Sequence, residues 1–212
     1  MSQQTFTFKP WGGARAGAGR KAAPGRRPVA HRLREVVYRS EPVHVTLRVR
    51  EHVWNLRSER CFRVVHRVLE EQRAKAELQV VEYAVQGNHV HLLVEAEGNA
   101  GLARGMRSLT IKLTHRLNRM MGLRGPVFEG RYHAHPLRTQ AEARNALRYV
   151  RGNFASHASR RGEQVSAAFV DPYSSAAVRE PRVGQLGLWP VAVTAEPRTW
   201  LMGRAKRVQG KG

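Results

Sequence analysis

Apolar and polar residues alternate strictly between residues 43 and 49, where every second residue is Val or Leu. The polar residues between them are His44, Thr46 and Arg48. Because side chains on a strand alternate between its two faces, this pattern predicts a half-buried β-strand. Three more strands are predicted, two of them joined by a turn at Gly87-Asn88. They lie at about residues 78–86, 89–95 and 126–137.

Three other segments repeat apolar residues at intervals of three and four, which is the spacing of an amphipathic helix. They cover about residues 58–76, 102–122 and 140–157. The apolar stripe of the last segment consists of Ala143, Ala146, Leu147, Val150 and Phe154. The order β-α-β-β-α-β, with a further helix after it, predicts an α+β fold of the ferredoxin-like (split βαβ) type. In such an antiparallel sheet the first and third strands are adjacent at the centre.

Composition divides the chain into three parts. Residues 1–40 contain nine Lys or Arg and one acid among many Gly, Ala and Pro residues, and we expect a flexible basic arm. Residues 41–160 are expected to form the folded domain. Residues 161–212 are expected to form an irregular extension that packs partly on this domain and frays from Lys206 onward. The single cysteine, Cys61, excludes an intramolecular disulfide and a cysteine-based zinc cluster.

The charge of the chain points to a nucleic acid. Thirty-seven Lys and Arg residues against sixteen Asp and Glu give a formal net charge of +21. Such a field attracts polyanions, and counterion release then favours binding. A ribosomal-type basic protein and a generic nucleic-acid binder are alternatives at this stage. No apolar run approaches the ~20 residues that a membrane span needs, and the polar N-terminus lacks a secretory signal. We therefore expect a cytoplasmic, nucleoid-associated protein without a membrane partner.

Two histidines form the candidate chemical site. His89 and His91 are two residues apart on a predicted strand, so their side chains leave the same face of the sheet. The central pairing would put them beside His44, Thr46 and Arg48. Two imidazoles can hold one divalent ion but cannot fill a structural zinc site, which needs four protein ligands. An ion with open positions can polarise a phosphate oxygen, although an isolated His-x-His pair is often only part of a solvated strand.

The surrounding residues extend this pattern. Gly87-Asn-His-Val-His-Leu-Leu-Val94 resembles the HUH segment of the single-tyrosine transposases, the insertion-sequence and REP-associated tyrosine transposase group. The resemblance covers about residues 42–158, and its other parts are the Val-His-Val-Thr strand, the basic helix, Gly130-Arg-Tyr132 and Leu147-Arg-Tyr-Val-Arg-Gly-Asn153. It implies a ferredoxin-like fold, a bound Mg²⁺ or Mn²⁺ and a helix-borne tyrosine that attacks DNA.

Carried over residue by residue, the resemblance implies that Tyr149 is the nucleophile and that His89 and His91 are metal ligands. It also makes Asn153 a candidate third ligand. Residues 149 and 153 are one helical turn apart and share a face that is offset from the apolar stripe. Tyr132 is the rival nucleophile, but it is expected on a strand and lacks such a partner one turn away.

The implied function is that of a metal-dependent DNA transposase and endonuclease. It would cut and rejoin single-stranded DNA, at hairpin or repeat ends, through a 5′-phosphotyrosine intermediate. The candidate DNA-binding residues are Arg48, Arg104, Arg107, Lys112, Arg116, Arg119, Arg131, Arg148 and Arg151. The alternatives are a non-catalytic ferredoxin-like nucleic-acid-binding protein and a domesticated nickase that acts on repeat hairpins. A homodimer is a further expectation left open, because some relatives donate the tyrosine helix to a partner's site while others act alone.

Overall fold

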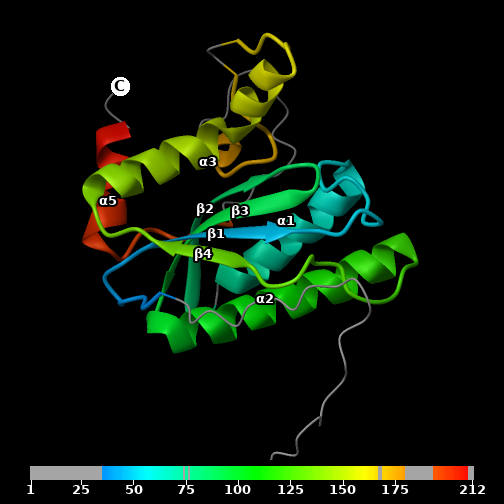
Figure 1. The fold of residues 1–212 in the computed structure, drawn as a ribbon, viewed down its shortest axis with the longest axis horizontal. Helices are drawn as coiled ribbons and strands as arrows, with labels where there is room; N and C mark the ends of the chain where they lie inside the picture. Colours follow the sequence, from blue (N-terminus) through cyan, green and yellow to red (C-terminus); the bar gives the residue numbers. More distant parts are fainter. Residues whose placement is uncertain (1–34, 74, 76, 167–168, 180–192, 210–212) are drawn as a thin grey trace, which may run out of the picture. The chain divides into compact units, whose positions relative to one another are not determined.

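Four strands form one antiparallel sheet at the centre of the folded domain (Figure 1). The computed structural model describes residues 35–73, 75, 77–166, 169–179 and 193–209, so the predicted arm at residues 1–34 lies outside it. The strand order is β2-β3-β1-β4. The strands are β1 (Val43–Arg48), β2 (Leu78–Val85), β3 (His89–Ala96) and β4 (His133–Pro136). The predicted ferredoxin-like α+β fold is confirmed, with β1 and β3 adjacent at its centre.

The alternation of β1 decides what each face of the sheet carries. Val43, Val45 and Leu47 are buried on one face, while His44, Thr46 and Arg48 lie on the other. The register with β3 pairs Thr46 with His91 and Arg48 with His89. Because the strand period is two, the imidazoles of β3 lie on the same face as the polar residues of β1.

Two helices cover the apolar face of the sheet. They are α1 (Glu59–Arg73) and α2 (Gly98–Met121), which lies below the sheet in Figure 1. Phe62 and Leu109 are among their fully buried residues and join the β1 and β3 side chains in the main core. The second helix ends at Gly122, which adopts the left-handed conformation (φ 67°) that glycine tolerates best.

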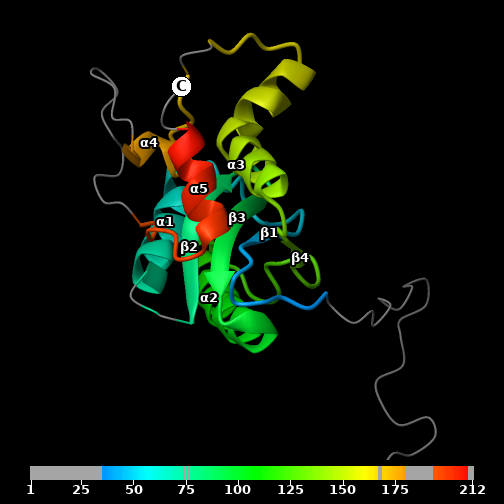
Figure 2. The same cartoon turned by 90° about the vertical axis from the view of Figure 1, so that its left-hand side faces the viewer.

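The opposite face is covered by α3 (Gln140–Arg160) and α5 (Trp200–Gln209), which lie side by side (Figures 1 and 2). A capping box begins α3: the Thr139 hydroxyl accepts the Glu142 N–H, and the Glu142 carboxylate accepts the Thr139 N–H. Leu147 and Val150 of α3 and Met202 of α5 form a second apolar cluster against Leu93 of β3. A short helix, α4 (Ala176–Arg179), precedes α5.

The fourth strand is shorter than predicted. Instead of spanning about residues 126–137, the chain makes an isolated bridge from Phe128 to Val49 and then turns at Gly130, whose φ is 75°. This turn interrupts the ladder, so regular pairing begins only at His133. The prediction that Tyr132 lies on a strand is therefore wrong, since it precedes β4 by one residue.

The residues beyond 160 are more ordered than the predicted irregular extension. Helix α5 continues to Gln209 instead of fraying at Lys206, because the Lys206 ammonium lies 3.0 Å from the fully buried carboxylate of Glu82 on β2. Glu82 also pairs with Arg151 of α3 (3.2 Å) and accepts the Ser175 hydroxyl. The extension thereby ties α3 to the sheet through one buried carboxylate.

A second contact that holds α3 involves Phe154. This residue was predicted to belong to the buried apolar stripe of the helix, but it is only half-buried and lies outside the apolar cluster. The Arg57 guanidinium lies 4.1 Å from the Phe154 ring centroid and 4.4 Å from that of Tyr173. Arg57 also makes a bidentate ion pair with buried Asp171, with N–O distances of 2.8 and 2.9 Å. Desolvated contacts of this kind restrict where the C-terminal half of α3 can lie.

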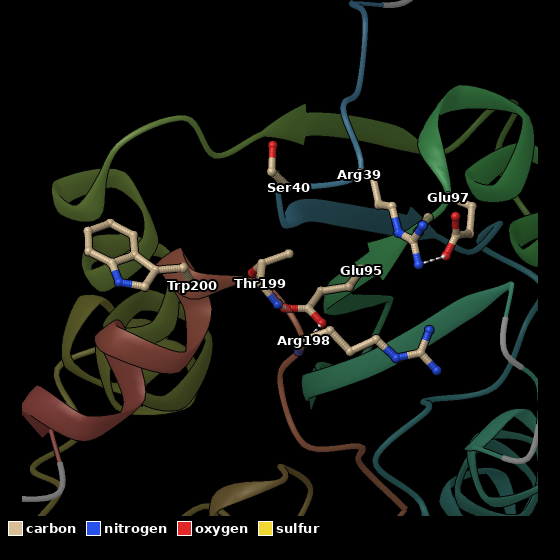
Figure 3. Close-up of a pocket in the computed structure, with 8 residues that line it drawn as sticks. Arg39, Ser40, Glu95, Glu97, Arg198, Thr199 and Trp200 are labelled. Carbon is tan, nitrogen blue, oxygen red and sulfur yellow. Dashed lines mark hydrogen bonds and ion pairs between the residues drawn. The ribbon is translucent and has the colours of Figure 1, made fainter.

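The far end of β3 holds the start of α5 (Figure 3). The buried Glu95 carboxylate accepts the backbone N–H groups of Arg198 (2.6 Å) and Thr199 (3.0 Å). An exposed ion pair between Arg39 and Glu97 (3.1 Å) lines the same pocket. The Glu95 carboxylate thereby satisfies N–H groups at the start of α5 and holds this helix end against β3.

The end of the predicted arm is also packed. Residues 35–40 were expected to be flexible, but Val37 is buried and its N–H donates to the side-chain oxygen of Asn99 on α2 (2.6 Å). In the described part of the chain, no helix combines the length and apolar character needed to cross a membrane.

Candidate active site

Three histidines gather on the sheet face that α3 covers. His89 and His91 come from β3 and His44 from β1. The ring centroids of His89 and His91 are 4.7 Å apart, and those of His44 and His91 are 5.2 Å apart. The expectation that His89 and His91 project from the same side of the sheet agrees with this arrangement.

Tyr149 of α3 lies over these rings. Its ring centroid is 5.1 Å from that of His91 and 5.8 Å from that of His44, both with edge-on geometry. The side chain is 46% exposed, so a ligand can approach the phenol from solvent. Tyr132 packs instead against the core cluster on the α1–α2 side of the sheet. The structure therefore separates Tyr132 from the histidines and brings Tyr149 to them.

Asn153 lies one turn after Tyr149 and is fully buried. Neither its side-chain oxygen nor its nitrogen has a hydrogen-bond partner among the described residues, and the same holds for Nε2 of His91. An unsatisfied buried polar group costs about 1–3 kcal/mol, so buried amides in folded proteins are normally satisfied. These atoms suit a bound cation, for which an amide oxygen is a hard ligand and a neutral imidazole a common one.

The described residues contain no group of three or more His, Cys, Asp or Glu side chains placed to hold a metal. A metal site built on the two β3 imidazoles would therefore have to be completed by ligands of another kind, for which the amide oxygen of Asn153 is a candidate. The fit of a divalent ion to this set of residues is supported by the buried side-chain atoms of Asn153 and His91 that have no hydrogen-bond partner among the described residues.

The other ring nitrogen of His91 has two partners. Nδ1 lies 3.1 Å from the Thr46 hydroxyl oxygen and 3.1 Å from Nε2 of His44. When Nδ1 carries the ring proton, either neighbour can accept it, and Nε2 keeps its lone pair. In that tautomer, the two partners hold the ring in one orientation, as the supporting partners of metal-binding histidines do.

The imidazoles are held in their neutral form. Burial lowers the pKa of His91 to about 3, with help from the positive charge that His89, His44 and His157 would carry. Burial, followed by the proximity of His133 and His135, lowers the pKa of His44 to about 4. The pKa of His89 is also lowered, mainly by burial. Neutral imidazole is the form that can bind a metal, so these rings keep that capacity at neutral pH.

Sequence reasoning missed three nearby histidines. His157 lies eight residues after Tyr149 on α3, and its ring centroid is 6.0 Å from that of His89. The helical spacing of residues 149, 153 and 157 could have found it. His133 and His135 are exposed on β4, where they pair with Thr46 and His44 of β1. Only the register of the short β4 strand brings them beside the site.

The structure divides the candidate DNA-binding residues between the two faces of the sheet. The α3 side holds Arg148, which is exposed, and Arg151, which is only 25% exposed and pairs with Glu82. Arg48 lies on the polar face of β1, the face that carries the histidines, and its guanidinium pairs with the Glu129 carboxylate (3.0 Å). Arg131 is exposed in the turn before β4. Five candidates belong to α2, on the far side of the sheet from Tyr149, and they are Arg104, Arg107, Lys112, Arg116 and Arg119. The sheet therefore separates the five α2 residues from Tyr149, and Arg151 is engaged in holding α3.

Comparisons with known proteins agree with this fold. A solved REP-associated tyrosine transposase bound to a REP hairpin superposes with a TM-score of 0.54 at 15% identity, covering 78% of this chain and 91% of that one. A candidate transposase from Deinococcus radiodurans R1 matches with a TM-score of 0.40 at 12% identity, covering 66% of this chain and 99% of that one. No curated protein matches the sequence. Residues 38–153, which include the β3 histidines, Tyr149 and Asn153, match the family model described as "Transposase IS200 like". Because the matched segment is more than half of the chain, the protein belongs to the IS200-like transposase family.

Proposed function

We propose that this transposase cleaves and rejoins single-stranded DNA with Tyr149 as its nucleophile. The observation that carries the proposal is the position of the exposed Tyr149 ring, 5.1 Å from the His91 ring, in the same chain. The unpartnered amide of Asn153 one turn further supports a metal-assisted reaction at the same place. Tyr132 packs instead against the core on the opposite side of the sheet.

The proposed step is a transesterification. The Tyr149 phenol loses its proton to solvent, and its oxygen attacks the phosphorus of the scissile phosphodiester. The bond from phosphorus to the 3′ oxygen breaks, and that oxygen takes up a proton and leaves as a 3′-hydroxyl group. The 5′ end remains attached to the protein as a phosphotyrosine ester, so one ester replaces another. Attack of a different 3′-hydroxyl on this ester rejoins DNA without an external energy source.

His89, His91 and Asn153 are the proposed ligands of a divalent ion, Mg²⁺ or Mn²⁺. When bound, such an ion draws charge from a phosphate oxygen and favours ionisation of a nearby phenol. With the ring proton of His91 on Nδ1, where Thr46 or His44 can accept it, Nε2 is available to the ion. Two histidines with lowered pKa keep this arrangement uncharged at neutral pH.

The proposed substrate is a single strand with hairpin or repeat ends. The formal charge of +21 and the exposed Arg148 beside Tyr149 favour phosphate binding. The similar solved transposase is bound to a REP hairpin, which supports a substrate of the same kind. A non-catalytic binder that stacks bases on its sheet is less well supported, because α3 and α5 cover the face that would have to be open.

An adduct assay tests the proposal. Labelled hairpin DNA with a single-stranded flank, incubated with the protein and Mg²⁺ or Mn²⁺, should yield a covalent protein–DNA band that resists denaturation. The band should disappear with a chelator and in Tyr149→Phe, which removes only the nucleophilic oxygen.

Tyr132→Phe is the matched control and should form the adduct normally. If Tyr149→Phe still forms the adduct and Tyr132→Phe does not, the nucleophile is wrongly assigned. If the wild type binds the DNA but gives no adduct with either ion, the protein is a binder and not a nuclease. Transfer of the attached strand to a second DNA end would separate a transposase from an enzyme that only nicks.

A further inference from the structure

Gln86 is a buried residue that directly follows β2. The register of β2 with β3 pairs Ala84 with His91, and the Gln86 N–H donates to the His89 carbonyl (2.8 Å). Because the side chains of a strand alternate with a period of two, those of Ala84 and Gln86 leave the same face as the two imidazoles. Gln86 therefore lies beside His89 on the face of the sheet that α3 covers.

Asn153 of α3 faces the same part of the sheet. Tyr149, one turn earlier on the helix, has its ring centroid 5.1 Å from that of His91. His157, one turn later, has its ring centroid 6.0 Å from that of His89. Residues that are one turn apart share a helix face, so the fully buried side chain of Asn153 is enclosed between α3 and these two histidines.

A contact at the end of β2 joins the segments that carry the two amides. The Arg57 guanidinium lies 4.1 Å from the Phe154 ring centroid and also donates to the Val85 carbonyl (2.9 Å). One cation thus bridges Phe154 and Val85, which are the chain neighbours of Asn153 and Gln86. The two amides are therefore held on segments that pack against each other.

The side chains of His91, Asn153 and Gln86 have four buried polar atoms without a hydrogen-bond partner among the described residues. These atoms are His91 Nε2, Asn153 Oδ1, Asn153 Nδ2 and Gln86 Nε2. A cation can engage the imidazole nitrogen and the amide oxygen, which carry lone pairs. It cannot engage the two amide nitrogens, which only donate hydrogen bonds. A bound ion therefore satisfies half of the set and leaves two donors without an acceptor.

We propose that Gln86 is a positioning residue for the metal site, and that it hydrogen-bonds the Asn153 amide so that the Asn153 oxygen faces the ion. The inference rests on the proposed function in taking His89, His91 and Asn153 as ligands. With Oδ1 turned to the ion, Asn153 Nδ2 turns away from it and donates to Gln86 Oε1, which a half turn of the Gln86 amide brings inward. Such a turn is accessible because the last torsion of a glutamine side chain is broad and roughly two-fold. Gln86 Nε2 then takes the place of Oε1, which is not one of the unpartnered buried atoms of the described chain.

The orientation of Asn153 matters because the two ends of an amide differ in what they offer a cation. The oxygen is a hard ligand for Mg²⁺, whereas the nitrogen presents only N–H groups. Neither end of the Asn153 amide is fixed by a hydrogen bond within the part of the chain that the structure describes. Gln86 selects between the two orientations and, by accepting the Nδ2 proton, makes the ligating oxygen more basic. The supporting partners of metal ligands act in this way.

Mn²⁺ titrations of the DNA-free protein test this role without any cleavage. Gln86→Met keeps the length of the side chain and removes both amide atoms. Gln86→Glu keeps an oxygen that can accept from Asn153. Gln79→Met is the matched control, because Gln79 lies at the opposite end of β2, where it pairs with Glu95, and also has an unpartnered buried amide atom.

Gln86→Met should weaken Mn²⁺ binding about tenfold or more, which is the usual effect of removing a supporting partner of a metal ligand. Gln86→Glu should bind Mn²⁺ at least as tightly as the wild type, and Gln79→Met should match the wild type. In an Asn153→Leu background, Gln86→Met should have no further effect, because Gln86 acts only through the Asn153 amide. The melting temperature of metal-free Gln86→Met should equal or exceed that of the wild type, since an unpartnered buried amide is replaced by an apolar chain of the same length.

Three results would overturn the proposal. One is a wild-type affinity in Gln86→Met, and another is a loss of the same size in Gln79→Met. The third is a loss that persists in the Asn153→Leu background, because Gln86 would then be a ligand in its own right. If Asn153→Leu binds Mn²⁺ too weakly for a titration, Gln86→Glu decides: a loss as large as that of Gln86→Met overturns the proposal.

The proposed cleavage site fails by different results. If the wild type binds no Mn²⁺, or if Asn153→Leu binds it as tightly as the wild type, the proposed ligand set is wrong. If Asn153→Leu weakens binding and Gln86→Met does not, only the role of Gln86 is wrong. Gln86→Met should still form the covalent DNA adduct at saturating Mn²⁺, because Tyr149 and the proposed ligands are all retained.

Discussion

Removing both hydrogen-bond partners of His91 Nδ1 should weaken metal binding far more than removing either partner alone. The Thr46 hydroxyl and His44 Nε2 each lie 3.1 Å from this atom, within the ordinary range for a hydrogen bond. In the tautomer that leaves Nε2 free for the ion, Nδ1 has one proton to donate, and either acceptor is enough to keep the proton there. We therefore expect Thr46→Val and His44→Leu each to reduce Mn²⁺ affinity only a few-fold.

The double variant leaves the Nδ1 proton buried without an acceptor. His91 is 4% exposed, so water cannot easily replace the two partners. The proton can then move to Nε2, which blocks the lone pair that the ion needs. Removal of such supporting partners typically reduces metal affinity 10–100-fold, or about 1.4–2.7 kcal/mol. The reduction in the double variant should exceed the sum of the two single reductions, which a double-mutant cycle measures directly.

Isothermal titration with Mn²⁺ gives the affinities, and thermal unfolding of each metal-free protein checks the fold. Thr46→Ser and His44→Gln are the matched controls, because each keeps an acceptor at a similar position. The reasoning is refuted if the double variant binds Mn²⁺ as tightly as Thr46→Ser does. Strictly additive single effects would also refute it, because they would mean that the two acceptors are not interchangeable.

Three further results are expected. Asn153→Leu should keep or raise the melting temperature, because neither amide atom has a partner in the described chain, and should weaken Mn²⁺ binding at least tenfold; lower stability with unchanged affinity would make the residue structural. A mixture of Tyr149→Phe and His91→Ala proteins should give no DNA adduct, since both groups meet within one chain, and an adduct band would reveal tyrosine helices exchanged in a dimer. In urea titrations, the unfolding free energy of the metal-free protein should fall as the pH drops from about 6.5 to about 4. In this range the unfolded chain binds a proton at His91 that the folded protein does not bind, because burial lowers the pKa of His91. This difference contributes about 1.4 kcal/mol per pH unit. His91→Gln should make this profile less steep without abolishing it, because the pKa values of His44 and His89 are also lowered, and an unchanged slope would contradict the assignment.

The polar face of the candidate site was predictable because it depends on local geometry alone. A period of two puts His89 and His91 on one side of a strand, and a period of 3.6 puts Tyr149 and Asn153 on one side of a helix. Neither period changes with the rest of the fold. The order of the elements added the pairing of the first and third strands, which the register of Thr46 with His91 confirms.

The distribution of the arginines could not be obtained in this way. A run of basic residues on an amphipathic helix shows that one face is polar, but not which side of the sheet that face lies on. Arg116 and Arg119 therefore resembled neighbours of Tyr149 and instead line a groove with Arg67. Arg151 resembled a DNA contact and instead pairs with a buried carboxylate.

The sequence by itself determined the first three strands, the helices α1 to α3 and the chemical groups that these elements present on one face. The tertiary structure decided which faces meet: it packed α3 over the histidines and secured that helix through Glu82, Lys206 and the Arg57–Asp171 pair. The Arg57–Asp171 pair joins residues 114 positions apart, and the Lys206 ammonium also donates to the Val81 carbonyl, 125 positions away. No local periodicity records such pairs, because they form only when distant segments exclude water from the same buried site.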